Sequence, residues 1–343
     1  MTEIAVLGAG RIGSLHAENL LAHDPGLDLV IHDSDAAAGQ ALAGRLGARF
    51  VASAAEALAV RDAVVIATPS QTHPGLIAAG VERGLTVFCE KPIATTSDQA
   101  LGVAELVRDA GGRVQVGFQR RCDPAYTRLR DAVSAGEAGD LLFVRTTAFD
   151  RDPPPAEFFA LSGGFAADCV VHDLDAVPWL TGRRITQVYA DGAVLTEGPY
   201  AEHDDHDVLT VLLTLEGGVR AVLTASRTQP HGYDHRVEVM GTKGALSAGL
   251  TPRTPLTPVE GTAPGEARAE PYDGFVDRFA EAYAAEMAAF VALCRDEGAN
   301  PCPIGETLDA MRAVEATRRS LRTGQRVELA QDLSSNCPLP GRV

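Results

Sequence analysis

The order of apolar and polar positions divides the chain into two patterns. In the first, short apolar runs such as IAVL at 4–7 and AVVIA at 63–67 alternate with segments of helical spacing such as SLHAENLLAH at 14–23. The short runs predict buried strands, and the spaced segments predict amphipathic helices. Regular alternation of the two with short connections predicts a parallel, doubly wound sheet in an α/β fold.

The second pattern begins after about residue 120, where strands follow one another without helices between them. DLLFVRTTAF at 140–149 and HRVEVMGTKGALSA at 235–248 are rich in strand-forming residues. Between them, at 207–228, the letters LEGG separate two apolar runs and predict a hairpin. The change of pattern predicts a second domain of α+β type.

A length of 343 residues suits two domains. We expect a first domain at 1–120 and a second at 121–343, with the last helices able to pack back on the first. Within the second, residues 250–271 are rich in Pro, Thr and Gly and predict a surface loop, and residues 333–343 predict a poorly ordered tail.

Composition limits the partners of the chain. Its net charge of −16 disfavours binding to nucleic acid and to anionic membrane surfaces. It contains neither an apolar run of membrane-spanning length nor a secretory signal pattern at its start. The six cysteines are scattered without a CxxC pair, which is typical of reduced thiols in a cytoplasmic protein.

A glycine-rich motif follows the first predicted strand. GAGRIG places Gly8, Gly10 and Gly13 in GxGxxG spacing, and Asp33 follows at the end of the second predicted strand. These glycines permit a tight turn, the approach of a pyrophosphate and close packing of helix on strand. The alternative is a glycine-rich turn without a ligand, but the strand, helix and acid around the motif favour a dinucleotide site.

Asp33 also predicts which dinucleotide binds. A carboxylate can accept hydrogen bonds from the adenosine ribose hydroxyls and repels a 2′-phosphate, and no Arg follows it, so NAD is expected. In a doubly wound sheet, ligands bind at the carboxyl ends of the strands. The remaining candidate cofactor residues are therefore Arg11, Ile12, Thr68, Pro69, His73, Glu90 and Lys91.

The helix predicted around GGFAADCVVHDLDAVPWL at 163–180 is apolar but also carries several acids and a histidine. Asp168 and His172 are four residues apart and can meet on one helical face, and Asp175 can face the same side. The alternative is a helix start whose acids suit the dipole, with a histidine satisfied in the core. The histidine titrates near neutral pH and suits a general base.

Motifs throughout the chain resemble the glucose–fructose oxidoreductase/inositol dehydrogenase/MocA (Gfo/Idh/MocA) family, and within it the inositol 2-dehydrogenase branch most. The segments that carry the resemblance are EKP at 90–92, GFQRRCDPAY at 117–126, RDPPPAEFFALSGG at 151–164, GGFAADCVVHDLD at 163–175 and FVDRFAEAYAAEMAAFV at 275–291. The resemblance implies a Rossmann domain followed by a domain with an open, mostly antiparallel sheet. It also implies a catalytic group of Lys91, Asp168 and His172.

The activity implied by the resemblance is NAD-dependent oxidation of a secondary hydroxyl, with myo-inositol as the expected substrate. His172 would take the proton, Asp168 would orient the imidazole or hold the lysine, and Lys91 would stabilise charge on oxygen. The candidate substrate contacts are Arg121, Asp150, Asp152, Asp175 and Tyr233. The family resemblance and the predicted exposed sheet also lead us to expect a homo-oligomer, either a tetramer or a dimer.

Several alternatives stay open. DRDP at 150–153 and Pro178 depart from relatives that carry His-Arg-Asn-Pro and Arg at these places, so scyllo-inositol or an aldose is also a candidate substrate. A redox-neutral, NAD-using glycosidase and a non-catalytic NAD-binding regulator are less favoured. EHDDHD at 202–207 has the composition of a metal site, but we expect turn residues and solvated charge there, and no metal.

Overall fold

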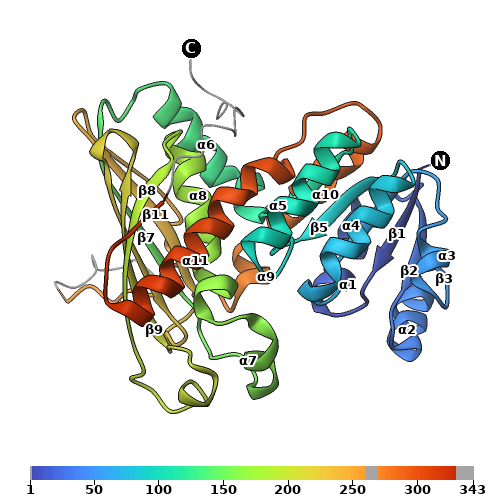
Figure 1. The fold of residues 1–343 in the computed structure, drawn as a ribbon, viewed down its shortest axis with the longest axis horizontal. Helices are drawn as coiled ribbons and strands as arrows, with labels where there is room; N and C mark the ends of the chain where they lie inside the picture. Colours follow the sequence, from blue (N-terminus) through green and yellow to red (C-terminus); the bar gives the residue numbers. More distant parts are fainter. Residues whose placement is uncertain (1, 260–268, 330–343) are drawn as a thin grey trace. The chain divides into compact units, whose positions relative to one another are not determined.

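The computed structural model of the protein describes residues 2–259 and 269–329 (Figure 1). The chain divides into two compact units, which are Met1–Asp123 with Glu281–Leu308, and Pro124–Ala280 with Asp309–Val343. The second unit is thus not one continuous segment, because Glu281–Leu308 returns to the first. The surface loop predicted at 250–271 falls partly outside the described residues, and the tail predicted at 333–343 lies wholly outside them.

The first unit contains a six-stranded parallel sheet with the order β3-β2-β1-β4-β5-β6. The strands are β1 (Glu3–Leu7), β2 (Asp28–His32), β3 (Arg49–Phe50), β4 (Ala63–Ile66), β5 (Thr86–Glu90) and β6 (Val114–Gly117). This confirms the predicted doubly wound sheet. The strand order reverses between β1 and β4, and a ligand site of this fold is expected where these strands end.

Helices cover both faces of this sheet (Figure 1). They are α1 (Arg11–His23), α2 (Ala36–Leu46), α3 (Ala54–Ala57), α4 (His73–Glu82), α5 (Ser97–Asp109) and α10 (Ala280–Cys294). Alternate residues Ile4 and Val6 of β1 share a buried cluster with Leu20 of α1 and Phe290 of α10. On the opposite face, Gly80 of α4 lies so close to β4 and β5 that a larger residue would meet their valines. Both faces are therefore apolar, as a buried parallel sheet requires.

The second unit contains a seven-stranded sheet with the order β12-β11-β7-β10-β9-β8-β13. Its strands are β7 (Leu141–Phe149), β8 (Ile185–Ala193), β9 (Val208–Leu215), β10 (Arg220–Ser226), β11 (Asp234–Gly241), β12 (Ala245–Ala248) and β13 (Val327–Glu328). Neighbours are antiparallel except β7 and β10, which are parallel. The predicted open, mostly antiparallel sheet is confirmed, as is the hairpin at LEGG, where Gly217 adopts φ 76° between β9 and β10.

Helices pack against one face of this second sheet (Figure 1). The helices of the unit are α6 (Pro124–Ser134), α7 (Ala156–Ser162), α8 (Val171–Thr181), α9 (Phe275–Arg278) and α11 (Leu308–Thr323). Ser320 of α11 accepts a hydrogen bond from the N–H of Ala190 in β8, which ties that helix to the sheet. Across residues 2–259 and 269–329, no helix combines the length and apolar character needed to cross a membrane.

The opposite face of the second sheet is mixed in character. Leu212 of β9 and Met240 of β11 are exposed. Between them in the sheet, Arg145 of β7 forms an ion pair with Glu238 of β11. The exposed face is therefore less apolar than the strand sequences suggested, and the homo-oligomer stays a prediction.

The acidic stretch EHDDHD contains two buried acids, so our expectation of solvated charge is wrong for them. Asp207 is 1% exposed, and its carboxylate accepts hydrogen bonds from the N–H groups of Leu195 and Thr196 and from the Thr196 hydroxyl. Asp205 is also buried and accepts one from the N–H of Phe165 at 2.8 Å. Both side chains hold loops in place, which sequence polarity alone does not reveal.

We predict that Asp207 stabilises the protein in a pH-dependent way. Burial raises its pKa, but the hydrogen bonds from Thr196 and Leu195 outweigh burial and lower the pKa from its ordinary value of 3.8. The stabilisation is therefore complete above that pH and is lost as the pH falls through the lowered value. At neutral pH, Asp207→Asn should lower the free energy of unfolding by about 1–3 kcal/mol, because an amide cannot accept all of these bonds.

Urea unfolding of both proteins from neutral to acidic pH measures this difference. The matched control is Asp204→Asn in the same stretch, where the side chain is exposed and φ is 51°, a conformation that Asn tolerates. This control should change the free energy of unfolding by less than about 0.5 kcal/mol. Equal losses in the two variants would contradict the prediction.

Candidate active site

The glycine-rich loop between β1 and α1 has the shape of a phosphate site. Gly8 has φ 101°, and a Cβ there would lie 2.4 Å from the carbonyl oxygen of Ala67. A Cβ on Gly13 would lie 1.8 Å from the Gly8 carbonyl oxygen, whereas one on Gly10 would meet nothing within 4 Å. Gly10 is the N-cap residue of α1. No side chain caps the helix there, and no acid occupies its first turn. The loop therefore leaves open space beside the first turn of α1, where the N–H groups of a helix start can bind a pyrophosphate.

Asp33 lies against this loop at the end of β2. Its Oδ2 accepts a hydrogen bond from the N–H of Ala9 at 2.6 Å, and its Oδ1 accepts one from the N–H of Asp35 at 2.7 Å. These two bonds fix the direction of the carboxylate beside the glycines. Each oxygen keeps a second lone pair that can accept from a ribose hydroxyl. These residues fit the adenosine half of NAD.

His73 connects the loops that follow β4 and β5. Its Nε2 lies 2.8 Å from the carbonyl oxygen of Thr68, and its Nδ1 lies 2.8 Å from that of Pro92. Both contacts are with backbone carbonyl oxygens, so the ring lies between the two loops. The ring is buried, so this contact geometry explains how the loops of Thr68 and Lys91 are held, while direct contact of His73 with a cofactor stays a prediction.

Glu90 and Lys91 follow β5 and belong to a buried polar cluster. Glu90 Oε1 lies 2.7 Å from His16 Nε2, and its Oε2 accepts from the N–H of Lys91 at 3.2 Å. The carboxyl of Glu286 in α10 lies close by. One ring nitrogen of His16 and one carboxylate oxygen each of Glu90 and Glu286 all lie within 4.8 Å of one another. Burial, followed by the charge of Glu90, raises the pKa of Glu286 well above its ordinary range. Protonated Glu286 can thus remain beside Glu90 without repelling it.

His16 and Glu286 were not among the candidate residues, although His16 had a sequence signal. The buried face of α1 consists of Gly13, His16, Ala17 and Leu20, which is helical spacing. A histidine on that apolar stripe indicates a buried partner. Glu286 gave no comparable signal, because its contact with Glu90 joins distant parts of the chain.

In the second unit, Asp168 and His172 lie on consecutive helical segments. Asp168 belongs to a π-helical turn (Ala166–Val170), and His172 lies in α8, which follows directly. Single π turns of this kind are frequent at functional sites. The expected regular α-helical face is therefore interrupted at Asp168. Both residues are half-buried, Asp175 is buried in the same helix, and a contact between Asp168 and His172 stays a prediction.

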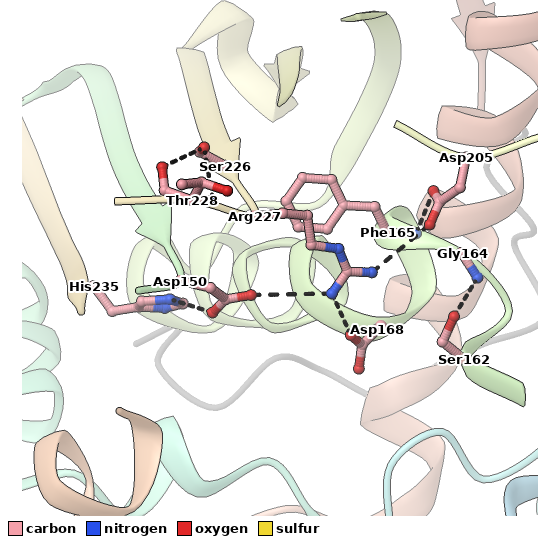
Figure 2. A network of polar contacts seen from close by, with 10 residues as sticks. All are labelled: Asp150, Ser162, Gly164, Phe165, Asp168, Asp205, Ser226, Arg227, Thr228 and His235. Carbon is pink, nitrogen blue, oxygen red and sulfur yellow. Dashed lines mark hydrogen bonds and ion pairs between the residues drawn. The ribbon is translucent and has the colours of Figure 1, made fainter. Parts of the chain in front are cut away.

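Arg227 joins Asp168 to two other acids (Figure 2). Its Nη1 lies 2.8 Å from Asp168 Oδ2 and 4.0 Å from Asp150 Oδ2, and its Nη2 lies 3.8 Å from Asp205 Oδ2. The guanidinium also lies over the ring of Phe165, 4.3 Å from its centroid. Arg227 was not among the candidates. In the sequence, Arg227 could have been noticed as a charged residue at the end of the apolar stretch 207–228, since the ends of buried strands can carry polar groups.

Asp150 also contacts an imidazole that we did not single out. Its Oδ1 lies 3.5 Å from His235 Nε2 (Figure 2). The ring of Tyr233 stacks on that of His235, with the centroids 4.0 Å apart and the planes 7° from parallel. The structure thus brings together Asp150, Tyr233 and, through Arg227, Asp168.

The other two substrate candidates lie elsewhere. Arg121 is in the first unit, where its buried side chain forms a 2.6 Å ion pair with Glu306. Asp152 is largely exposed, and its Oδ2 lies 3.7 Å from Arg151 Nε. Arg121 therefore has a structural partner, and Asp152 is not fixed by its surroundings. A substrate role for either one stays a prediction.

Two protein-family models match this chain, one in each unit. The model of the oxidoreductase family with an NAD-binding Rossmann fold matches residues 2–118, and the model of the GFO/IDH/MocA C-terminal domain matches residues 126–247. These matches cover the glycine-rich loop and the EKP segment in the first unit, and the Asp168 helix and the Arg227 strand in the second.

Curated relatives and solved structures match over almost the whole chain. The chain is 35% identical to inositol 2-dehydrogenase of Rhizobium meliloti over 327 residues, which are 95% of this chain and 98% of the relative. It is 34% identical to scyllo-inositol 2-dehydrogenase (NAD(+)) of Bacillus subtilis, over 95% of each chain. Scyllo-inositol dehydrogenase from Lactobacillus casei, solved with NAD(H) and scyllo-inositol, has a TM-score of 0.85 at 27% identity, covering 96% of this chain and 100% of that one.

Proposed function

Because the chain belongs to the GFO/IDH/MocA oxidoreductase family, we propose that it is an NAD-dependent cyclitol dehydrogenase that oxidises myo-inositol at a secondary hydroxyl to the 2-keto product. The observation that carries the proposal is the likeness over 95% of the chain to an inositol 2-dehydrogenase. The choice of NAD is supported by the Asp33 carboxylate, which lies beside the glycine loop at the start of α1.

The residues have separate tasks in this reaction. NAD, held by the glycine loop and Asp33, would supply the hydride acceptor at C4 of its nicotinamide. His172 takes the proton of the hydroxyl, for which a positioned neutral imidazole is suited. Asp168 orients that imidazole, and the ammonium group of Lys91 stabilises the negative charge that develops on the hydroxyl oxygen. Asp150 and Tyr233 hold other hydroxyls of the ring.

Scyllo-inositol is the second candidate substrate. The observation that favours it is the 34% identity to a scyllo-inositol 2-dehydrogenase, which is nearly equal to the identity with the inositol 2-dehydrogenase. The two cyclitols differ in the orientation of one hydroxyl, so one or two carboxylates can decide between them. Asp150 is well placed for this role, because Arg227 and His235 fix its carboxylate on two sides.

Substrate oxidation is tested by NADH formation with a panel of myo-inositol, scyllo-inositol and aldoses. We expect the highest kcat/KM with myo-inositol. A higher value with scyllo-inositol or an aldose would correct the substrate. NAD binding without NADH formation from any member of the panel would favour the glycosidase or the non-catalytic regulator instead.

We predict that Asp33 sets the preference for NAD over NADP. The wild-type enzyme should have the higher kcat/KM with NAD, because the carboxylate accepts from ribose hydroxyls and repels a 2′-phosphate. Asp33→Ala should lower kcat/KM for NAD by about 10-fold or more, since hydrogen bonds to charged groups contribute about 1.5–3 kcal/mol. The ratio of kcat/KM for NAD to that for NADP should fall in this variant. Equal use of both cofactors by the wild type would sink the idea.

We predict that His172→Ala lowers kcat by about 10²–10⁴-fold, which is the usual contribution of a positioned base. In the wild type, the rate of oxidation should rise with pH across neutrality, because only the neutral imidazole accepts a proton. Affinity for NAD should survive, since the glycine loop and Asp33 belong to the first unit. The measurements are steady-state kinetics and titration of NAD binding.

The matched control is His23→Ala, which removes an exposed histidine at the end of α1. It should leave kcat unchanged. Near-normal turnover in His172→Ala would show that another group takes the proton. A variant of a nearby acid such as Asp205→Ala would not serve as a control, because the Asp205 carboxylate accepts a hydrogen bond from the N–H of Phe165 beside the catalytic helix.

A further inference from the structure

Arg227 is a buried cation with no task in the reaction as described so far. It directly follows β10, and its side chain is 2% exposed. Three carboxylates from three separate segments face its guanidinium, at 2.8 Å for Asp168, 3.8 Å for Asp205 and 4.0 Å for Asp150 (Figure 2). One positive charge therefore lies among three acids.

The strand order explains how these groups meet. β10 lies beside β7 in parallel register, with Ser226 opposite Phe149. The next residues along each strand, Arg227 and Asp150, therefore leave the sheet at the same edge. The N–H of Arg227 donates to the carbonyl oxygen of Asp207 at 2.8 Å, which fixes the backbone from which the guanidinium extends.

Arg227 places a positive charge against all three carboxylates. Burial opposes the charge of Arg227, but the neighbouring Asp168 raises its pKa above its ordinary value, so it stays protonated. The other charged or titratable groups around these carboxylates are Cys169, His172 and Asp173 on the Asp168 helix, His235 on β11, and Arg318 on α11. Without Arg227, repulsion among the three acids would favour protonation of at least one of them.

We propose that Arg227 is a positioning residue that offsets the negative charge of the three acids, fixes the direction of the Asp168 carboxylate, and couples it to Asp150 through the shared Nη1. The inference rests on the proposed function, in which Asp168 orients His172. A fixed Asp168 carboxylate holds the imidazole ready to accept a proton. The same guanidinium nitrogen also faces the acid that we propose as a substrate contact, so substrate binding and base orientation share one anchor.

The charge and the shape of Arg227 make separable contributions. Removing the charge leaves the negative charge of the three acids without this cation, which favours protonation of the site. The acid limb of the pH–rate profile, the low-pH range in which the rate rises with pH, should therefore move to higher pH. A lysine keeps the positive charge but lacks the planar guanidinium group with its fixed N–H directions. It should therefore loosen the orientation of the carboxylates but leave the acid limb in place.

The experiment compares Arg227→Gln and Arg227→Lys with the wild type by measuring kcat and KM for the best cyclitol from about pH 5 to 10. In Arg227→Gln, we expect kcat to fall by about 10- to 100-fold, the range for residues that orient a functional ligand. Its acid limb should move up by about 1–3 pH units, the effect of an opposite charge at this distance. Arg227→Lys should restore the acid limb while kcat stays reduced.

The matched control is Arg220→Gln, at the exposed start of the same strand β10, which should leave kcat and the acid limb unchanged. An acid limb that stays at the wild-type pH in Arg227→Gln, or one that moves equally in Arg220→Gln, overturns the inference. If circular dichroism shows that Arg227→Gln does not fold, Arg227→Lys decides: reduced kcat with an unmoved acid limb supports the inference, and unchanged kcat overturns it.

Failure of the proposed function would look different. In that case the wild type would form no NADH with cyclitols, or His172→Ala would match it. The inference about Arg227 would then fall together with the function. An active wild type, an inactive His172→Ala and an unaffected Arg227→Gln would instead retain the function and reject the role of Arg227 alone.

Discussion

The strand faces that pack against helices are mostly apolar, so the polar groups of the candidate site lie where strands end, and both units of this protein are arranged around that constraint. In the first, the ends of β1, β2 and β5 carry the glycine loop, Asp33 and Glu90. In the second, the ends of β7 and β10 carry Asp150 and Arg227. Between these ends, the strand residues that face the helices are mostly apolar. The positions available for chemistry are thus limited to a few loops in each unit.

The two units satisfy their buried acids in different ways. In the first, Glu286 lies beside Glu90, and burial raises its pKa so that it holds a proton. In the second, Asp168 forms a 2.8 Å ion pair with the guanidinium of Arg227. A protonated acid supplies a hydrogen-bond donor, whereas an ionised acid supplies an acceptor and a charge. The first arrangement fits the NAD-binding unit, and the second fits the orienting role that we propose for Asp168.

The sequence predicted what depends on short spacing. Gly8, Gly10, Gly13 and Asp33 could be placed because the loop and its acid lie on consecutive strands. The two sheets followed from the change in apolar pattern. The buried state of Asp205 and Asp207 could not be predicted, because polarity does not report which N–H groups a distant loop brings near. Arg227 was missed for a related reason: its three acids are far from it along the chain.

The parallel pairing of β7 and β10 has a consequence for folding. These strands are separated in sequence by the helices α7 and α8 and by two further strands, so their pairing closes a long loop. The contacts of Arg227 with Asp150 and Asp168 can form only after that closure. If β10 slipped by one residue against its neighbours, its side chains would change faces and the guanidinium would point away from the acids. A chain with such a slip could be compact and rich in strand yet lack activity, so turnover reports on strand register as well as on chemistry.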